Sequence, residues 1–240
     1  MADFKTHVSF SSLLGVGYAA AGWQLLELPP VSCILAGGLC GVSGMLPDLD
    51  SNSGVPRRES VAFTATVVPM LMYERFQQLQ LDHETIVLAA VTIYLSIRML
   101  VPRLLTHFTV HRGMFHSIPA MLIAGGLAYL ACLSGSEEVR LFKAVGIMVG
   151  FASHLLLDEI YSIEWHHGRM RLKSSFGTAI KIWGKSLWAN LLTFALLGGV
   201  SFLVFNDNSL MQHYGPLQPG AASINNVAGK VEDTVNRYIK

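Results

Sequence analysis

The chain has 240 residues, of which 52% are hydrophobic and only 14% are charged. Soluble domains carry about 25% charged residues on average, so this chain has too few charges to cover a soluble surface. Its net charge of +1 also excludes the broad basic field that is typical of nucleic-acid-binding proteins. The composition therefore favours a membrane protein.

Apolar segments recur along the whole chain and predict an all-α, polytopic membrane protein. A straight span needs about 20 apolar residues, and some segments are shorter, notably 60–74 and 144–158. We therefore predict about seven transmembrane helices, with six as the alternative. In chain order the segments cover roughly residues 10–28, 31–47, 60–74, 84–101, 117–134, 144–158 and 188–205.

The connections between these segments are mostly short. Pro29 and Pro30 mark a tight turn, because a proline cannot continue a helix. The longest connection, residues 159–186, is basic. We predict a helical membrane domain over residues 1–205 and a polar C-terminal tail over residues 206–240, within which Val227 to Ile239 is compatible with a short surface helix.

Lysine and arginine set the orientation of a membrane protein, because they concentrate in its cytoplasmic loops. With seven spans, one side of the membrane receives eleven of the 17 basic residues and the other side receives six. The richer side holds the N-terminus, the loop after residue 47, the region 98–116 and the loop 159–187. We predict that this side is cytoplasmic and that the protein lies in a bacterial inner membrane.

Histidines and aspartates gather at the ends of apolar segments on that same predicted side. They come from four separate places in the sequence, which makes this co-location the strongest functional signal in the chain. We predict that the set binds a divalent metal at one face of the membrane domain. The candidate ligands are His7, Asp48, Asp50, His111, His116, His154 and Asp158.

The spacing of these residues suits convergence on an ion. His154 and Asp158 are four residues apart, so a helix places them on one face. Gly113 lies between His111 and His116 and favours a turn there, with Ser117 and Pro119 as the N-cap and first-turn proline of the next helix. Mixed imidazole and carboxylate ligands suit zinc, with manganese or iron as alternatives, in one or more ions.

Each motif also has a structural interpretation. A single histidine at a helix end is often only a hydrogen-bonded interfacial residue, and a His–Asp pair can be a structural hydrogen bond. Intramembrane ionisable residues are nevertheless costly and are functional candidates by default. Weaker candidates are His107, His166, His167, Glu159 and Glu164, whereas His83 and His213 are interpreted as bystanders on the opposite side, and Trp165, Trp183 and Trp188 as interfacial anchors.

The combined motifs resemble the YdjM-like family. They are Thr6-His7, Pro47-Asp48-Leu49-Asp50, the run from His111 to Ser117, and His154-x-x-x-Asp158, and the resemblance covers roughly residues 1–205. It implies an inner-membrane, metal-dependent hydrolase with a helical fold. A more distant similarity to zinc-dependent phospholipase C, an all-α phosphoesterase, is an analogy of fold.

The first functional hypothesis is thus a hydrolase that acts on a phosphate ester, such as a phospholipid or another lipid-linked phosphate, at the cytoplasmic face. Asp48 and Asp50 would bridge ions or act as base, and Arg112 would hold a phosphoryl oxygen. The alternative is a non-enzymatic metal-binding membrane protein, a transporter or a scaffold. A transport path would place polar residues at mid-membrane, whereas here they lie at segment ends.

Overall fold

The helices begin where the sequence supplies capping groups. In the computed structural model, α1 (Phe4–Leu25) starts after Asp3, whose carboxylate accepts a hydrogen bond from the Thr6 amide at 2.8 Å. Helix α6 (Ile118–Ala131) also begins after a capping residue. The hydroxyl of Ser117 accepts a hydrogen bond from the Ala120 amide, and a proline occupies the first turn of the helix. Both features of α6 confirm the sequence prediction.

The structure describes residues 3–50, 54–108, 113–133, 136–166, 169–172, 177 and 180–214. Within this part of the chain, helices account for most of the ordered elements, which confirms a helical fold. Besides α1 and α6, the elements are α2 (Pro30–Ser43), the 3-10 helix η1 (Leu46–Asp50), α3 (Val55–Leu71), α4 (Tyr73–Gln78), α5 (His83–Phe108), α7 (Glu137–Ile160), β1 (Ile163–His166), β2 (Arg169–Leu172) and α8 (Leu187–Tyr214).

Each of the predicted apolar segments falls mainly on a helix, but two details differ from the prediction. The connection 159–186 contains an antiparallel hairpin, in which Ile163 pairs with Leu172. Helix α8 continues to Tyr214, past the predicted end of the membrane domain at Phe205. The rest of the tail, with the predicted helix from Val227, lies outside the described residues.

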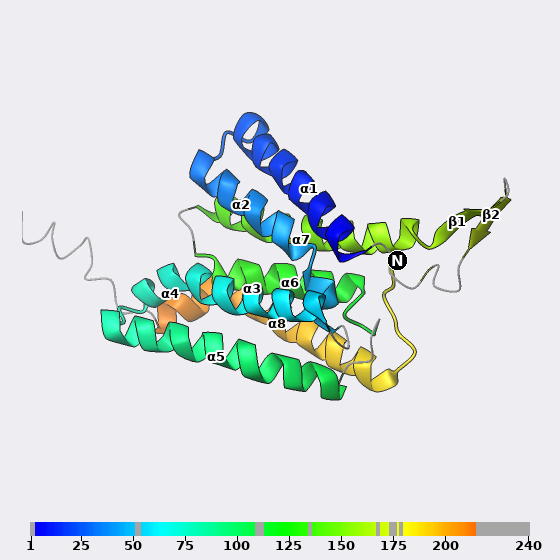
Figure 1. Ribbon diagram of the computed structural model, residues 1–240. Helices are drawn as coiled ribbons and strands as arrows, with labels where there is room; N and C mark the ends of the chain where they lie inside the picture. Colours follow the sequence, from blue (N-terminus) through cyan, green and yellow to red (C-terminus); the bar gives the residue numbers. More distant parts are fainter. Residues whose placement is uncertain are drawn as a thin grey trace, which may run out of the picture.

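Helix α7 forms the centre of the fold. It packs against α1 and α2 on one side and against α6 on the other, and α6 in turn contacts α8. Helix α5 packs mainly on α3 and lies at the outer edge, as Figure 1 shows. The most extensive burial is accordingly on α7, whose buried face includes Phe151, His154 and Asp158.

Small residues bring α1, α2 and α7 unusually close together. A Cβ added at Gly150 of α7 would lie 2.9 Å from the Cys40 carbonyl carbon of α2, with the Cys40 oxygen and Ser43 Oγ also closer than 3.0 Å. A Cβ added at Gly37 would lie 2.8 Å from Ala19 Cβ of α1. Backbone contacts of this kind are typical of helix packing in membranes, and they place the ends of these three helices side by side.

Three helices are long and apolar enough to cross a membrane, within the described residues: His83–Arg103 of α5, Glu137–Ile160, which is α7, and Leu187–Asp207 of α8. Two shorter apolar helices, α2 and α6, have 14 residues each. At 1.5 Å per residue these two extend about 21 Å, less than the roughly 30 Å hydrocarbon thickness. The fold is that of a helical membrane protein.

A buried ion cluster joins α4, α7 and α8. Arg75 Nη1 lies 2.9 Å from Asp207 Oδ1, and Arg140 Nη2 lies 2.5 Å from Asp207 Oδ2. The Arg140 guanidinium also stacks on the Tyr129 ring of α6, at 3.7 Å from its centroid. Arg140 is fourteen residues before His154 on α7, about 21 Å along the axis. The cluster thus ties the helices together at the end opposite His154.

Candidate metal centre

Five of the predicted ligands meet at one end of the helix bundle. His7 comes from the first turn of α1, Asp48 from η1, His116 from the turn before α6, and His154 and Asp158 from the last turns of α7. Four of these residues are buried, at 3% exposure or less, and Asp48 is intermediate. Segments far apart in the sequence therefore create the cluster.

The cluster contains two groups of three possible ligands. In each group, ligand atoms from all members lie within 4.8 Å of one another. The groups are His7, His154 and Asp158, and Asp48, His116 and His154. His154 belongs to both groups and thus lies at the centre of the cluster.

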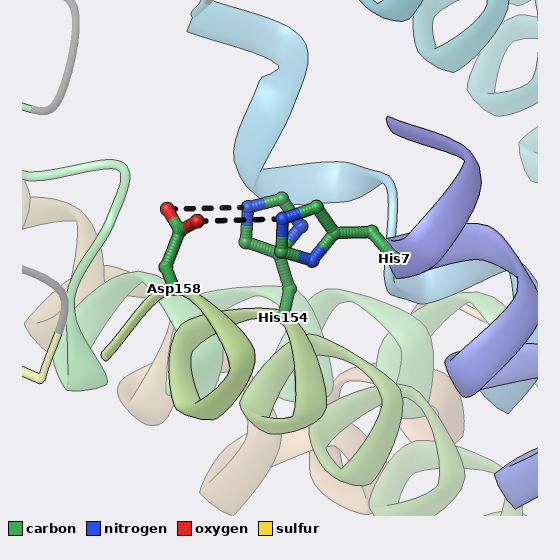
Figure 2. Close-up of side chains that lie close together, drawn as sticks. All are labelled: His7, His154 and Asp158. Atoms are coloured by element: carbon green, nitrogen blue, oxygen red, sulfur yellow. Dashed lines mark ion pairs between the residues drawn. The ribbon is translucent and has the colours of Figure 1, made fainter. Parts of the chain in front are cut away.

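The first group is the more compact one, and Figure 2 shows the two imidazole rings lying over each other beside the carboxylate. His7 Nε2 is 3.4 Å from Asp158 Oδ1, and His154 Nε2 is 4.0 Å from Asp158 Oδ2. The rings of His7 and His154 stack with centroids 3.7 Å apart. Two stacked imidazolium rings would repel each other, so this arrangement suits neutral rings, the form in which histidine binds a metal.

A backbone carbonyl orients the central histidine. His154 Nδ1 lies 2.7 Å from the carbonyl oxygen of Gly44, which can only accept, so Nδ1 carries the proton and donates it. His154 Nε2 then presents its lone pair to the cluster, 3.9 Å from Asp48 Oδ1. Metal-binding histidines usually have such a partner on the second nitrogen. Since only Nε2 is available, His154 can offer one ligand atom to one ion.

The first turn of α1 positions His7. Its amide donates to the Asp3 carbonyl at 3.2 Å, and the Asp3 carboxylate caps the same turn through Thr6. Hydrogen bonds from the Thr6 hydroxyl and amide hold the pKa of the Asp3 carboxyl below its ordinary value of 3.8. Asp3 therefore stays ionised and keeps the helix capped well below neutral pH.

The donor set fits a divalent metal. His154 Nε2, the nitrogen that faces the cluster, is buried and has no hydrogen-bond partner among the described residues. Leaving such an atom unpaired is costly unless a ligand satisfies it. Ligand atoms about 2.0–2.2 Å from a tetrahedral zinc lie roughly 3.3–3.6 Å apart, close to the 3.4 Å between His7 and Asp158. Three imidazoles and two carboxylates are donors that suit zinc, manganese or iron.

The two sides of the cluster differ in exposure. The Asp158 side chain is 1% exposed, whereas the Asp48 side chain is 15% exposed. His116 is fully buried, with its ring 5.5 Å from that of His154 and inclined by 63°. Asp48 is therefore the most accessible of the five side chains.

The remaining predicted site residues are not placed here. His111 and Arg112 lie outside the described residues, and so does the side chain of Asp50, although its backbone closes η1. The same is true of the weaker candidates His107, His166, His167 and Glu164 and of the bystander His213, of which the side chain or the whole residue is not described.

Two other residues lie apart from the cluster. Glu159 Oε1 accepts a hydrogen bond from the Gly177 amide at 2.5 Å and belongs to neither group of possible ligands. His83 is exposed at the first residue of α5. Neither residue therefore adds a donor to the cluster.

The role of Gly44 was not found from the sequence. It acts through a backbone carbonyl at the C-cap of α2, and no side-chain motif marks such a group. The packing of α2 against α7 alone brings this carbonyl to His154.

The fold and the cluster together define a helical membrane protein that gathers buried histidines and aspartates at one end of its bundle. The chain matches the sequence model of the YdjM inner membrane protein family over residues 1–203, and it belongs to this family. An inner-membrane location follows from the family and from the apolar helices. No curated protein and no solved structure matches the chain.

Proposed function

We propose that this protein is a membrane-bound, metal-dependent hydrolase that acts on a phosphate ester, such as a phospholipid or another lipid-linked phosphate. The observation that carries the proposal is the buried cluster of histidines and aspartates, in which His154 Nε2 has no hydrogen-bond partner within the described residues. Such a set is costly for a fold to maintain and is typical of a functional site.

His7, His154 and Asp158 would hold the metal, joined by Asp48 and His116 for the same ion or a second one. When bound, a divalent cation activates water and neutralises charge on a phosphoryl oxygen. Asp48 is the more exposed of the two carboxylates in the cluster, so it would accept the proton of the attacking water as general base. Asp50 and Arg112 keep their predicted roles as a second carboxylate and as a clamp for a phosphoryl oxygen.

Metal analysis of the purified protein tests the proposal. We expect stoichiometric zinc, manganese or iron in the wild type, and loss of this metal in His154→Ala and Asp48→Ala. His83→Ala is the matched control, because His83 is exposed and lies outside the cluster. A wild-type protein without stoichiometric metal would refute the proposal, and phosphodiester turnover that survives in both site variants would refute hydrolysis at this site.

The proposed orientation places the cluster on the cytoplasmic side, with seven helices entering the membrane, or six as the alternative. Cysteine labelling in whole cells tests this, since all three native cysteines are buried. We expect an impermeant thiol reagent outside the inner membrane to label Glu84→Cys at the start of α5 and to spare Arg58→Cys near the start of α3. The reverse pattern would invert the topology.

A non-enzymatic metal site is the second candidate. It is favoured by the burial of four of the five side chains, because structural metal sites are coordinatively closed whereas catalytic ones keep an open position. Transport is less well supported, since His154 lies only six residues from the end of α7, about 9 Å along the helix. Metal that is bound stoichiometrically, together with the absence of turnover on phospholipid and soluble phosphodiesters, would favour the structural role.

A further inference from the structure

Residues 180–188, which lead into α8, expose a row of large apolar side chains. These side chains are 46–82% exposed. Polar residues lie between them in the sequence, among them the exposed Lys185. The exposed apolar residues are Ile180, Ile182, Trp183, Leu187 and Trp188.

This segment lies at a membrane boundary, because the candidate span Leu187–Asp207 starts inside it. Tryptophan and lysine are the residues that concentrate at membrane–water interfaces, where one end of the side chain is apolar and the other is hydrated. Along α8 the exposed apolar surface continues through Leu191 and Leu196, so the segment adjoins a lipid-facing helix. Lipid is therefore the occupant that this surface favours.

The same segment is attached to the turn that carries His116. Ile118 lies two residues after His116, and its amide donates a hydrogen bond to the Lys181 carbonyl at 3.0 Å. On the other flank, a Cβ added at Gly184 would lie 3.0 Å from Met114 Sδ. The segment thus covers the turn on both sides of His116.

A buried asparagine holds the segment in this position. Asn190 is fully buried, its amide donates to the Gly184 carbonyl at 2.9 Å, and its oxygen accepts from the Gly184 amide at 2.8 Å. The oxygen and the nitrogen of the Asn190 side-chain amide thus both pair with the backbone of Gly184. Because the Asn190 side chain is buried, removing this partner would leave its polar atoms unpaired at a cost, which fixes the segment beside the candidate site.

We propose that residues 180–188 form an interface strap that seats in the lipid headgroup region and collects anionic phospholipids beside the candidate site. The apolar side chains anchor the strap, and Lys185 supplies the positive charge that attracts an anionic headgroup. The substrate that this arrangement selects is a phospholipid carried by the same bilayer, not a soluble phosphodiester. This last step rests on the proposed function, whereas the location of the strap does not.

Fluorescence quenching tests the location of the strap. The full chain is reconstituted into phosphatidylcholine vesicles, and the Trp183 signal is obtained as the difference between wild type and Trp183→Phe. We expect phosphatidylcholine with brominated acyl chains to quench this signal and aqueous iodide to leave it nearly unchanged. Quenching of Trp183 by iodide but not by brominated lipid would overturn the strap.

Energy transfer from Trp183 to dansyl-labelled lipid tests the headgroup preference. Labelled phosphatidylglycerol should be enriched over labelled phosphatidylcholine, and Lys185→Gln should reduce this enrichment about fivefold, which corresponds to about 1 kcal/mol per basic residue near an anionic surface. Arg58→Gln is the matched control, since Arg58 is exposed but paired with Glu59. Equal transfer to both lipids in the wild type would refute the preference.

The substrate class is tested separately, by turnover of phosphatidylglycerol in the vesicles against a soluble p-nitrophenyl phosphodiester. Faster turnover of the lipid supports the proposal, and a preference for the soluble ester overturns its substrate part. The quenching and transfer experiments need neither activity nor bound metal. A negative result in these two experiments therefore refutes the strap and not the metal site. A protein that lacks metal but shows the expected quenching and transfer refutes the proposed function and not the strap.

Discussion

Replacement of Gly150 by alanine should disrupt the candidate metal centre without touching any of its ligands. The added methyl would lie within 3.0 Å of three atoms of α2, two of which belong to the Cys40 backbone and cannot rotate away. Ordinary contact begins at 3.4 Å, so α2 and α7 would have to separate by about 1.5 Å at this point, and overpacking of this kind costs about 1–3 kcal/mol.

This displacement would act directly on His154, which lies one turn after Gly150. The bond from His154 Nδ1 to the Gly44 carbonyl, now 2.7 Å, would lengthen beyond the roughly 3.5 Å at which a hydrogen bond is lost. Metal sites tolerate errors of only about 0.5 Å. Loss of the partner that orients a ligand lowers metal affinity about 10- to 100-fold, and we expect Gly150→Ala to fall in this range.

The assay is chelator competition for zinc, with thermal unfolding of the same samples in detergent. Gly38→Ala is the matched control, because Gly38 is a glycine of α2, the helix that packs against Gly150, and an added Cβ there meets nothing within 4 Å. It should retain the affinity and gain up to about 1 kcal/mol from helix propensity. If Gly150→Ala binds zinc as tightly as the wild type and unfolds at the same temperature, the close packing of α2 and α7 does not position His154.

Three further outcomes are expected. His7→Ala should weaken zinc binding at least about tenfold in chelator competition, while His83→Ala has no effect. Zinc affinity should fall as the medium is made more acidic, because protons compete with the metal for the imidazole nitrogens and the carboxylates; an affinity that stays constant until the protein unfolds in acid would exclude these ligands. Asp207→Ala leaves the buried Arg140 and the partly buried Arg75 without their carboxylate and should destabilise the fold by about 3–5 kcal/mol in thermal unfolding, with the zinc content of the folded fraction unchanged.

Much of the architecture follows from local sequence patterns. The apolar runs predict the long helices, because a segment without charges is stable in a membrane only when its backbone hydrogen bonds are satisfied internally. Ser117 and Pro119 predict the start of α6 in the same way, through a capping hydroxyl and a preset backbone angle. The hairpin β1–β2 was missed, because its short strands lie in a polar connection without a clear alternating pattern.

The candidate site was only partly accessible from the sequence. The four-residue spacing of His154 and Asp158 places both on one helix face, and the topology brings His7, Asp48 and His116 to the same end of the bundle. No pattern indicates that the rings of His7 and His154 stack, because this contact joins two helices more than a hundred residues apart. Their contact depends on how closely α1, α2 and α7 pack.

Residue types and their order thus determine that this chain is a helical membrane protein of the YdjM inner membrane protein family with ionisable residues at the helix ends. Hydrophobicity and spacing are local properties, so the amino-acid sequence alone is sufficient to determine them. Which nitrogen of His154 faces the cluster, and how near Asp158 lies to His7, are decided only in the tertiary structure. Glycine-mediated contact between helices sets these distances, because a single added methyl at Gly150 would change them by more than a metal site tolerates.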